Sequence, residues 1–421
     1  MKSEISASTD LEAIAAKYGT PMFVYDADVL SSTARSVRTA LDERISVYYS
    51  LKANPNVSVV STLMRAGTRA EVSSLAELRT AINAGHPPEN VIFLGPGKTE
   101  EEIAACIDLR IRAIVCESFE ELERINDASY SAGTRAKVVL RVNPSFELKG
   151  SGLTMGGKAR QFGIDEEQFA GFVDLRGRYA SVDVEGVHAY MGTRILNEDA
   201  IVQNTLRILE MARRVAAIQR FPLKFVSVGG GWGVPYFEGE SPIDLQTVAD
   251  GVNDAARLHA TSHPQTEVAV ELGRYLTALA GAYVTSVLYT KTSRGEKFAV
   301  VDGGTNHHAA AGGVGSFVKR NFPVVVVGTE AGTSTSTWNV AGPLCTPNDL
   351  LVKKAELPDV KRGDLVAVLR SGAYGPTASP GLFLSHGFPA EVLLRDGEAH
   401  LIREADSTEN LLDRQILVDP A

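Results

Sequence analysis

ISVYYSLK, at residues 45–52, combines β-branched and aromatic residues with a terminal lysine, a composition typical of a buried strand. Seven similar runs follow before residue 275, separated by amphipathic stretches of helical length: RAEVSS (69–74), VIFLGP (91–96), RAIVCES (112–118), KVVLRVNP (137–144), VEGVHAY (184–190), FVSVGGG (225–231) and VAVELGR (268–274). Alternating strands and helices favour a parallel sheet, and eight such units are typical of a closed barrel. We therefore predict an α/β protein built on a (β/α)8, TIM-like barrel.

The sequence after residue 280 has a different pattern. Short apolar runs such as KFAVVDGG, FPVVVVG, DLVAVLR and AEVLLRDG are separated by Gly, Asp or Pro, with few helical stretches between them. This pattern predicts a C-terminal antiparallel β domain. We assign residues 31–279 to the barrel, 280–421 to the β domain, and 1–30 to an N-terminal segment that joins the β domain.

Composition narrows the class of partner and the compartment. The 421-residue chain has a net charge of −9 and no long basic run, which argues against nucleic acid or an anionic membrane as the main partner. Its three cysteines show no metal-ligand spacing and are too few for a disulfide framework, which indicates a reducing compartment. No signal-peptide pattern opens the sequence, and no segment has the length of a membrane span. We expect a cytoplasmic protein without a metal site.

Polar residues stand where the predicted strands end, and barrel enzymes place their reacting groups there. Lys52 follows the apolar run VYYSL. At a barrel mouth, loss of hydration would lower the pKa of this lysine and make its amine a nucleophile toward an aldehyde. The alternative is a lysine whose charged end reaches solvent at the rim. The position of Lys52 alone is compatible with both interpretations.

The last two predicted strands end in residues suited to a phosphate. Gly229 to Gly231 can present backbone N–H groups to an anion, although a triple glycine is also typical of a tight turn. Arg274 follows the eighth strand, and barrels commonly hold a phosphate at these strand ends. Glu271 ends the same strand in an apolar context, where a carboxylate needs a cationic partner. Either Arg274 or a protonated pyridine nitrogen would meet that need.

Five motifs together resemble the fold type III decarboxylases that depend on pyridoxal 5'-phosphate (PLP), the family of diaminopimelate and ornithine decarboxylases. The resemblance covers nearly the whole chain. The motifs are YYSLKANPN (48–56), VSVGGGWG (226–233), ELGRYL (271–276), AGPLCTPND (341–349) and SGAYG (371–375). Each motif alone is common, but their combination is specific.

The resemblance implies a role for each matching residue. Lys52 would be the Schiff-base lysine, and Glu271 would hold the pyridine nitrogen. The phosphate would be bound by Gly229, Gly230, Gly231, Arg274, Tyr374 and Thr193, the last standing where the family usually has Ser. Cys345 would be the general acid that returns a proton to the substrate carbon. Since this cysteine comes from the neighbouring subunit in the family, the resemblance also implies a homodimer with shared active sites; otherwise a buried core cysteine would be the simpler interpretation.

Three departures from the family pattern concern the cofactor ring and the substrate. The usual His-x-His-x-Gly-Ser is His188-Ala-Tyr190-Met-Gly-Thr here, so Tyr190 would stack on the cofactor ring, without the positive charge that an imidazole can carry. Diaminopimelate decarboxylases follow the cysteine with Glu-Ser-Gly-Asp and carry an Arg-Pro-Ala-Leu-Tyr segment. This chain has Thr346-Pro-Asn-Asp349 and VDGGTNHHAAAGGVG (301–315) instead. The groups that hold a second zwitterionic end are therefore missing.

These departures, with MGGKARQFG (155–163), resemble specialised family members. One such member decarboxylates a glutamyl group on an acyl-carrier protein in butirosin biosynthesis, and its sequence is the better match. Another decarboxylates a citryl-diaminopropionate in siderophore pathways. A bulky conjugate would leave the site past His307, His308 and Asp349, which would line its exit. His188 and Thr346 are further candidate substrate contacts. Alternatively, the two adjacent histidines are solvated loop residues, because neighbours on an extended segment point opposite ways.

We therefore predict a PLP-dependent decarboxylase that removes the α-carboxylate of a conjugated amino acid. A free substrate, such as diaminopimelate, ornithine, lysine or arginine, is one alternative, and a siderophore intermediate is another. A racemase that uses Lys52 and a tyrosine as two bases would keep the fold but change the reaction. A non-catalytic regulator is the alternative from another class, and the presence of both Lys52 and Cys345 argues against it.

Overall fold

The computed structural model describes residues 4–5, 9–147, 153–171, 174–313, 319–330 and 332–418. The chain divides into two compact units, and each is described by itself. A barrel unit comprises Ser31–Pro235 and Ser241–Leu276. A β unit comprises Met1–Leu30, Tyr236–Glu240 and Thr277–Ala421. The short segment Tyr236–Glu240 belongs to the β unit although its neighbours in sequence belong to the barrel.

The barrel unit is a closed ring of eight parallel strands. They are β2 (Ile45–Ser50), β3 (Arg69–Val72), β4 (Val91–Phe93), β5 (Ala113–Cys116), β6 (Ala136–Asn143), β9 (Val182–His188), β11 (Phe225–Gly230) and β12 (Glu267–Leu272). Each pairs with the next in this order, and β12 pairs with β2 in the register Val268↔Ile45, which closes the ring. The prediction of a (β/α)8 barrel is confirmed, with all eight strands at the expected positions.

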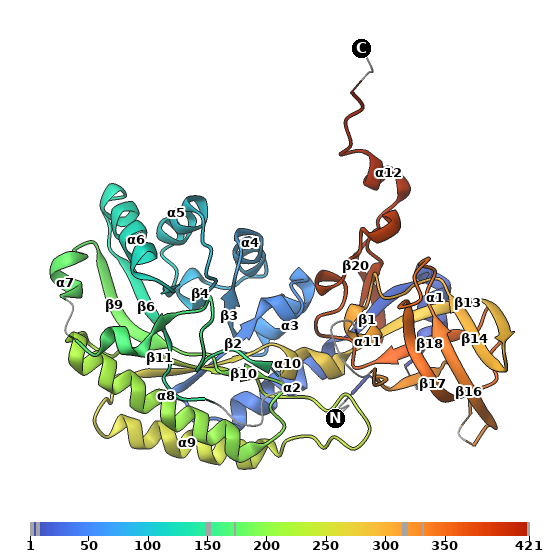
Figure 1. Ribbon diagram of the computed structural model, residues 1–421, viewed down its shortest axis with the longest axis horizontal. Helices are drawn as coiled ribbons and strands as arrows, with labels where there is room; N and C mark the ends of the chain where they lie inside the picture. The colour runs from blue at the N-terminus through green and yellow to red at the C-terminus, as the bar shows by residue number, and fades with distance from the viewer. Residues whose placement is uncertain are drawn as a thin grey trace. The chain divides into compact units, whose positions relative to one another are not determined.

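One helix precedes the first barrel strand and the others follow it, and together they lie around the barrel (Figure 1). They are α2 (Ala27–Ala40), α3 (Val57–Arg65), α4 (Leu75–Asn83), α5 (Glu100–Leu109), α6 (Phe119–Ser131), α7 (Leu175–Arg178), α8 (Glu198–Gln219), α9 (Leu245–Ala260) and α10 (Arg274–Thr277). Side chains cap the N-termini of α3 to α9; Thr99 and Glu102, for example, form a complete capping box before α5. Since these N-termini follow strand ends, their partial positive charge lies on the same side of the barrel as those ends.

The barrel interior is a packed core rather than a channel. Tyr48 and Phe225 make an edge-to-face contact with ring centroids 6.0 Å apart, among buried Ile92, Val115 and Val139. Ion pairs lie at the strand starts, where Arg112 contacts both Glu185 and Glu267 at 3.3 Å. The strand starts are therefore occupied by structural contacts, which leaves the opposite end for chemistry.

The β unit is built on strands that form one sheet in the order β17-β16-β14-β13-β1-β19-β20, with β18 on β13 and β15 on β18. The strands are β1 (Met22–Asp26), β13 (Gly281–Ser293), β14 (Glu296–Val301), β15 (Val324–Val326), β16 (Thr335–Ala341), β17 (Leu350–Pro358), β18 (Leu365–Leu369), β19 (Ala390–Arg395) and β20 (Glu398–Arg403). Its helices are α1 (Leu11–Tyr18), α11 (Ala309–Gly312) and α12 (Thr408–Leu412). One face of the sheet packs on α1 through Leu11, Ile14, Met22, Val284 and Val392.

Two pairings in this sheet are parallel, whereas the sequence predicted antiparallel strands throughout. β1 runs parallel to β19, and β14 runs parallel to β16. The chain between β14 and β16 is long enough to return and run the same way, which parallel neighbours require. β1 comes from the N-terminal segment, far from β19 in sequence, so no hairpin sets its direction.

Short elements complete the chain: the strands β7 (Leu153–Thr154), β8 (Ile164–Asp165) and β10 (Gly192–Thr193), and the 3-10 helices Leu51–Ala53, Pro88–Asn90, Glu166–Phe169, Ala278–Ala280, Pro376–Ala378 and Phe383–Ser385. Among the helices of the described residues, none is both long enough and apolar enough to cross a membrane.

Candidate active site

Lys52 lies at the C-terminal end of β2, in the short helix Leu51–Ala53, and pairs with a carboxylate from the next strand. Its Nζ atom is 3.1 Å from Oε1 and 3.2 Å from Oε2 of Glu71, in β3. The Glu71 side chain is 1% exposed, whereas that of Lys52 is 41% exposed. A buried acid therefore holds an amine that a small molecule can still reach.

Glu271 lies near the C-terminal end of β12 and is buried. The hydroxyl of Ser227, in β11, donates to Oε1 at 2.5 Å, and Nε2 of His188, in β9, lies 3.1 Å from the same oxygen. Burial alone would raise the pKa of Glu271, but His188, the Ser227 hydroxyl and the charge of Lys52 outweigh it and lower this pKa below its ordinary value. The carboxylate is thus kept ionised although it is buried.

Tyr190 follows β9 and stands beside Lys52. The Lys52 ammonium is 5.8 Å from the centroid of the Tyr190 ring, within the range of a cation–π contact. The ring also borders the glycine segment, since a Cβ at Gly229 would lie 2.9 Å from Tyr190 Cδ2. The phenol therefore lies between the lysine and the glycines.

The glycine segment cannot accept side chains. A Cβ at Gly230 would lie 1.7 Å from the backbone oxygen of Glu271, and one at Gly231 would lie 2.0 Å from that of Gly192. Gly229 and Gly231 also have φ angles of 66° and 80°, which favour glycine. Successive N–H groups in such a stretch form concave anion sites. The backbone of this segment, which carries no side chains, therefore lies beside β10, which contains Thr193. It also lies near the end of β12, and Arg274 follows that strand at the start of α10.

The residues of the barrel mouth fit PLP. An amine for covalent attachment, an ionised carboxylate for a pyridine nitrogen, an aromatic ring and a backbone phosphate cradle all lie at the carboxyl ends of β2, β9, β11 and β12. His188, predicted as a substrate contact, lies against Glu271 and is fully buried. Its Nε2 atom contacts the carboxylate of Glu271 directly.

The β unit carries the two other residues of the predicted machinery. Cys345 is an exposed free thiol in the loop between β16 and β17. Tyr374 has a φ angle of 54°, an unusual conformation for a residue other than glycine, in a turn where a Cβ at Gly372 would lie 1.9 Å from the Thr277 oxygen. That Cys345 and Tyr374 belong to the same active site as the barrel residues stays a prediction.

The remaining predicted contacts are placed within the β unit. His307 and His308 are buried, so the alternative of solvated loop histidines is wrong. Their Nε2 atoms lie 3.1 Å from the Gly387 oxygen and 2.9 Å from the Ser371 hydroxyl, respectively. Asp349 is buried as well, and Thr346 is half-buried in the Cys345 loop. A substrate role for these four residues stays a prediction; within the described part of the chain, all four make structural hydrogen bonds. Residues 314 and 315 of the divergent segment lie outside the described residues.

Sequence reasoning missed two contributors. Ser227 was not singled out, although a polar residue inside the apolar run FVSV was a usable signal. Glu71 lies in the predicted strand RAEVSS, but its distance from Lys52 along the chain gives no hint that the two side chains are adjacent. Neighbouring parallel strands bring them together, in the register Ser50↔Glu71.

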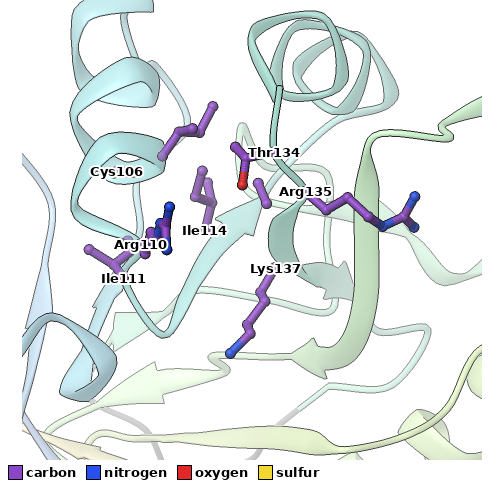
Figure 2. A pocket seen from close by; sticks show the side chains of 9 residues that line it. Cys106, Arg110, Ile111, Ile114, Thr134, Arg135 and Lys137 are labelled. Carbon is purple, nitrogen blue, oxygen red and sulfur yellow. The ribbon is translucent and has the colours of Figure 1, made fainter. Parts of the chain in front are cut away.

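A cavity of about 290 Å³ in the barrel unit lies away from these groups (Figure 2). It lies at the starts of β5 and β6 and the end of α5, and its lining includes apolar Cys106, Ile111 and Ile114 and basic Arg110; the Arg135 side chain extends away from these apolar residues (Figure 2). Since Lys52 and Glu271 lie at the opposite ends of the strands, this cavity is not part of the candidate site.

The chain matches the family model for the pyridoxal-binding domain of pyridoxal-dependent decarboxylases over residues 27–278. It is 37% identical over 414 residues to the L-glutamyl-[BtrI acyl-carrier protein] decarboxylase of Niallia circulans, covering 97% of this chain and 96% of that protein. It is 30% identical to a diaminopimelate decarboxylase of Helicobacter pylori (strain J99), covering 94% and 95%. The solved structure of the Helicobacter pylori diaminopimelate decarboxylase with L-lysine superposes with a TM-score of 0.85, at 29% identity and 96% and 98% coverage.

The geometry of Lys52, Glu271 and the glycine segment agrees with these similarities. The chain thus belongs to the pyridoxal-dependent decarboxylases, enzymes that use pyridoxal 5'-phosphate to remove a carboxylate from an amino acid.

Proposed function

We propose that the substrate is an amino acid conjugated at its distal end, with a glutamyl group on an acyl-carrier protein as the best candidate. The supporting observation is the 37% identity over nearly the whole chain to a relative named for that substrate. The sequence after Cys345 agrees with this, because Thr346-Pro-Asn replaces the Glu-Ser-Gly expected of an enzyme for free diaminopimelate. A conjugated amino acid has no second zwitterionic end, so it does not need the residues that bind one.

Four groups of the chain have distinct tasks in this reaction. Bound PLP supplies an electron sink for the pair left when CO2 departs. Lys52 would hold the cofactor covalently through its amine, which Glu71 keeps in position. Glu271 would hold the ring nitrogen, since Ser227 and His188 keep its carboxylate ionised. Cys345 gives a proton from Sγ to the carbon that lost CO2.

We also propose a homodimer whose two sites each combine Lys52 of one subunit with Cys345 of the other, in a cytoplasmic enzyme. The exposed Cys345 thiol and the two buried free thiols suit a reducing compartment. Mixing inactive Lys52→Ala and Cys345→Ala proteins tests the shared site, because a hybrid dimer would contain one intact site. Recovery of about a quarter of wild-type turnover is expected for statistical mixing of two such subunits. A mixture as inactive as its parts would contradict shared sites.

The substrate proposal is tested by measuring CO2 release from carrier-bound glutamate and from free glutamate, diaminopimelate, ornithine, lysine and arginine. We expect kcat/KM for the carrier-bound substrate to exceed that for every free amino acid by at least about a hundredfold, which corresponds to about 2.7 kcal/mol of transition-state binding. A preference for free diaminopimelate would favour the second candidate, which the 30% identity to diaminopimelate decarboxylases supports.

A further inference from the structure

Asp349 ties the loop that carries Cys345 to a neighbouring turn. Its Oδ2 atom accepts a hydrogen bond from the backbone N–H of Leu344 at 2.8 Å, directly before Cys345. Its Oδ1 atom accepts from the backbone N–H of Thr305 at 2.7 Å and from the Thr305 hydroxyl at 2.9 Å. One carboxylate therefore joins the turn after β14 to the residue that precedes the thiol.

The carboxylate is enclosed on both sides by glycines. A Cβ at Gly304 would lie 2.3 Å from Oδ1, and a Cβ at Gly342 would lie 2.3 Å from Oδ2. Asp349 is 3% exposed as a residue, whereas Cys345 is an exposed thiol. Little room remains for a substrate group beside Asp349.

A second set of bonds fixes the end of the same loop. Lys319 donates from Nζ to the backbone oxygens of Leu350 at 2.5 Å, Leu351 at 3.1 Å and Ala311 at 2.8 Å. Within the loop, the Thr346 N–H donates to the Leu344 oxygen at 2.8 Å, and the Asp349 N–H donates to the Thr346 oxygen at 3.2 Å. The loop is thus closed at its base, with the thiol at its exposed tip.

We infer that Asp349 is a positioning residue that holds the Cys345 loop in the conformation from which the thiol delivers its proton, rather than a contact for the substrate. This inference rests on the proposed role of Cys345. A proton donor needs a fixed distance and direction to the carbon that it protonates, and small displacements are costly. An exposed loop tip has few packing contacts to supply that precision, so a buried acceptor at its base supplies it.

Asp349→Asn is the sharpest variant because it keeps the shape of the side chain. An amide has one acceptor oxygen, so its NH2 group must face the N–H of either Leu344 or Thr305, and one buried donor loses its acceptor. Asp359→Asn is the matched control, since it makes the same change on an exposed carboxylate of the β unit. Thr305→Ala is a milder second variant that removes the 2.9 Å bond only.

Hydrogen exchange in the cofactor-free protein tests the tether without any turnover. Exchange should be at least about tenfold faster in Asp349→Asn at whichever of the Leu344 and Thr305 amides loses its acceptor, less accelerated in Thr305→Ala, and unchanged at both in Asp359→Asn. Unchanged exchange at both the Leu344 and the Thr305 amides in Asp349→Asn would overturn the inference.

A double-mutant cycle then tests whether Asp349 acts through the thiol. In otherwise wild-type protein, Asp349→Asn should lower kcat about tenfold with KM within about twofold, and the same change should lower kcat less than about twofold in a Cys345→Ala background. An equal loss in both backgrounds, or a rise in KM with kcat unchanged, would show a substrate contact and overturn the inference. Wild-type turnover by Cys345→Ala itself would instead remove the proposed role of Cys345, while the hydrogen-exchange result would still report on the tether.

Discussion

The Nζ atom of Lys52 lies within 3.2 Å of both carboxylate oxygens of Glu71, an acid that is 1% exposed on the neighbouring barrel strand. This pair connects two residues that are 19 positions apart in sequence. It places the amine that we propose to bind the cofactor at a defined point of the barrel mouth, beside the Tyr190 ring.

Glu71→Gln should weaken catalysis without preventing covalent attachment of the cofactor. The amide keeps the shape but removes the charge that holds the Lys52 ammonium, and hydrogen bonds to charged groups contribute about 1.5–3 kcal/mol. We expect kcat to fall about tenfold or more, with the absorption band of the lysine-linked cofactor retained. Lys52→Ala, the comparison variant, should lose both the turnover and the absorption band. Full activity of Glu71→Gln would show that the ion pair has no catalytic role.

Glu271→Gln should retain the cofactor but lose most turnover, by about a hundredfold or more. A neutral amide cannot keep a ring nitrogen protonated, so the electron sink is weakened. Ser227→Ala should give a smaller loss in the same direction, because it removes one of the groups that lower the pKa of Glu271. Steady-state kinetics with cofactor absorbance separates turnover from binding. A Glu271→Gln enzyme with wild-type kcat would exclude the proposed contact.

Gly230→Ala should abolish cofactor binding or the local fold, because the added Cβ would lie 1.7 Å from the Glu271 oxygen. Gly97→Ala is the control, since no atom lies within 4 Å of a Cβ at that loop position of the same unit. Titration with PLP, followed by absorbance, should show saturable binding in the control only. Wild-type affinity in Gly230→Ala would contradict the close packing of the glycine segment.

Iodoacetamide should modify Cys345 alone near pH 8 and inactivate the enzyme. Burial raises the pKa of Cys106 to about 12 and that of Cys116 still further, so neither supplies the reactive thiolate. Cys345 is exposed. Peptide mass spectrometry identifies the modified residue. Modification of Cys106 before Cys345, or full turnover after Cys345 is blocked, would be inconsistent with the structure and its proposed proton donor.

The β unit should lose stability as the pH falls from about 6.5 toward 4. Burial lowers the pKa of His307 to about 4 and the pKa of His308 to about 3, whereas both pKa values are near 6.5 in an unfolded chain. In this range the unfolded state binds protons that the folded state does not, so acid favours unfolding. Melting temperature should therefore fall with pH, and less steeply in His308→Gln than in the control His400→Gln, which changes a half-exposed histidine. Equal slopes would show that His308 does not titrate on unfolding.

The barrel could be predicted from the sequence because each of its strands and helices produces a local pattern of apolar and polar residues. Lys52, Glu271 and the three glycines were recognisable because the motifs that contain them together resemble one family, whereas their positions at strand ends alone left structural alternatives open. Pairings between distant segments were not recognisable, which explains the parallel β1–β19 and β14–β16 neighbours that the prediction missed. Burial of polar loop residues was also hidden. Asp349 and His308 look like surface residues until the turns that enclose them are folded.

The most direct test of the proposed reaction uses a carrier-bound glutamyl substrate labelled at its α-carboxylate carbon. We expect release of labelled CO2 by the wild-type enzyme, an amine product on the carrier that is lighter by one CO2, and loss of both in Lys52→Ala. Intact substrate after prolonged incubation with PLP-loaded enzyme, or inversion at the α-carbon without loss of label, would contradict the proposed reaction.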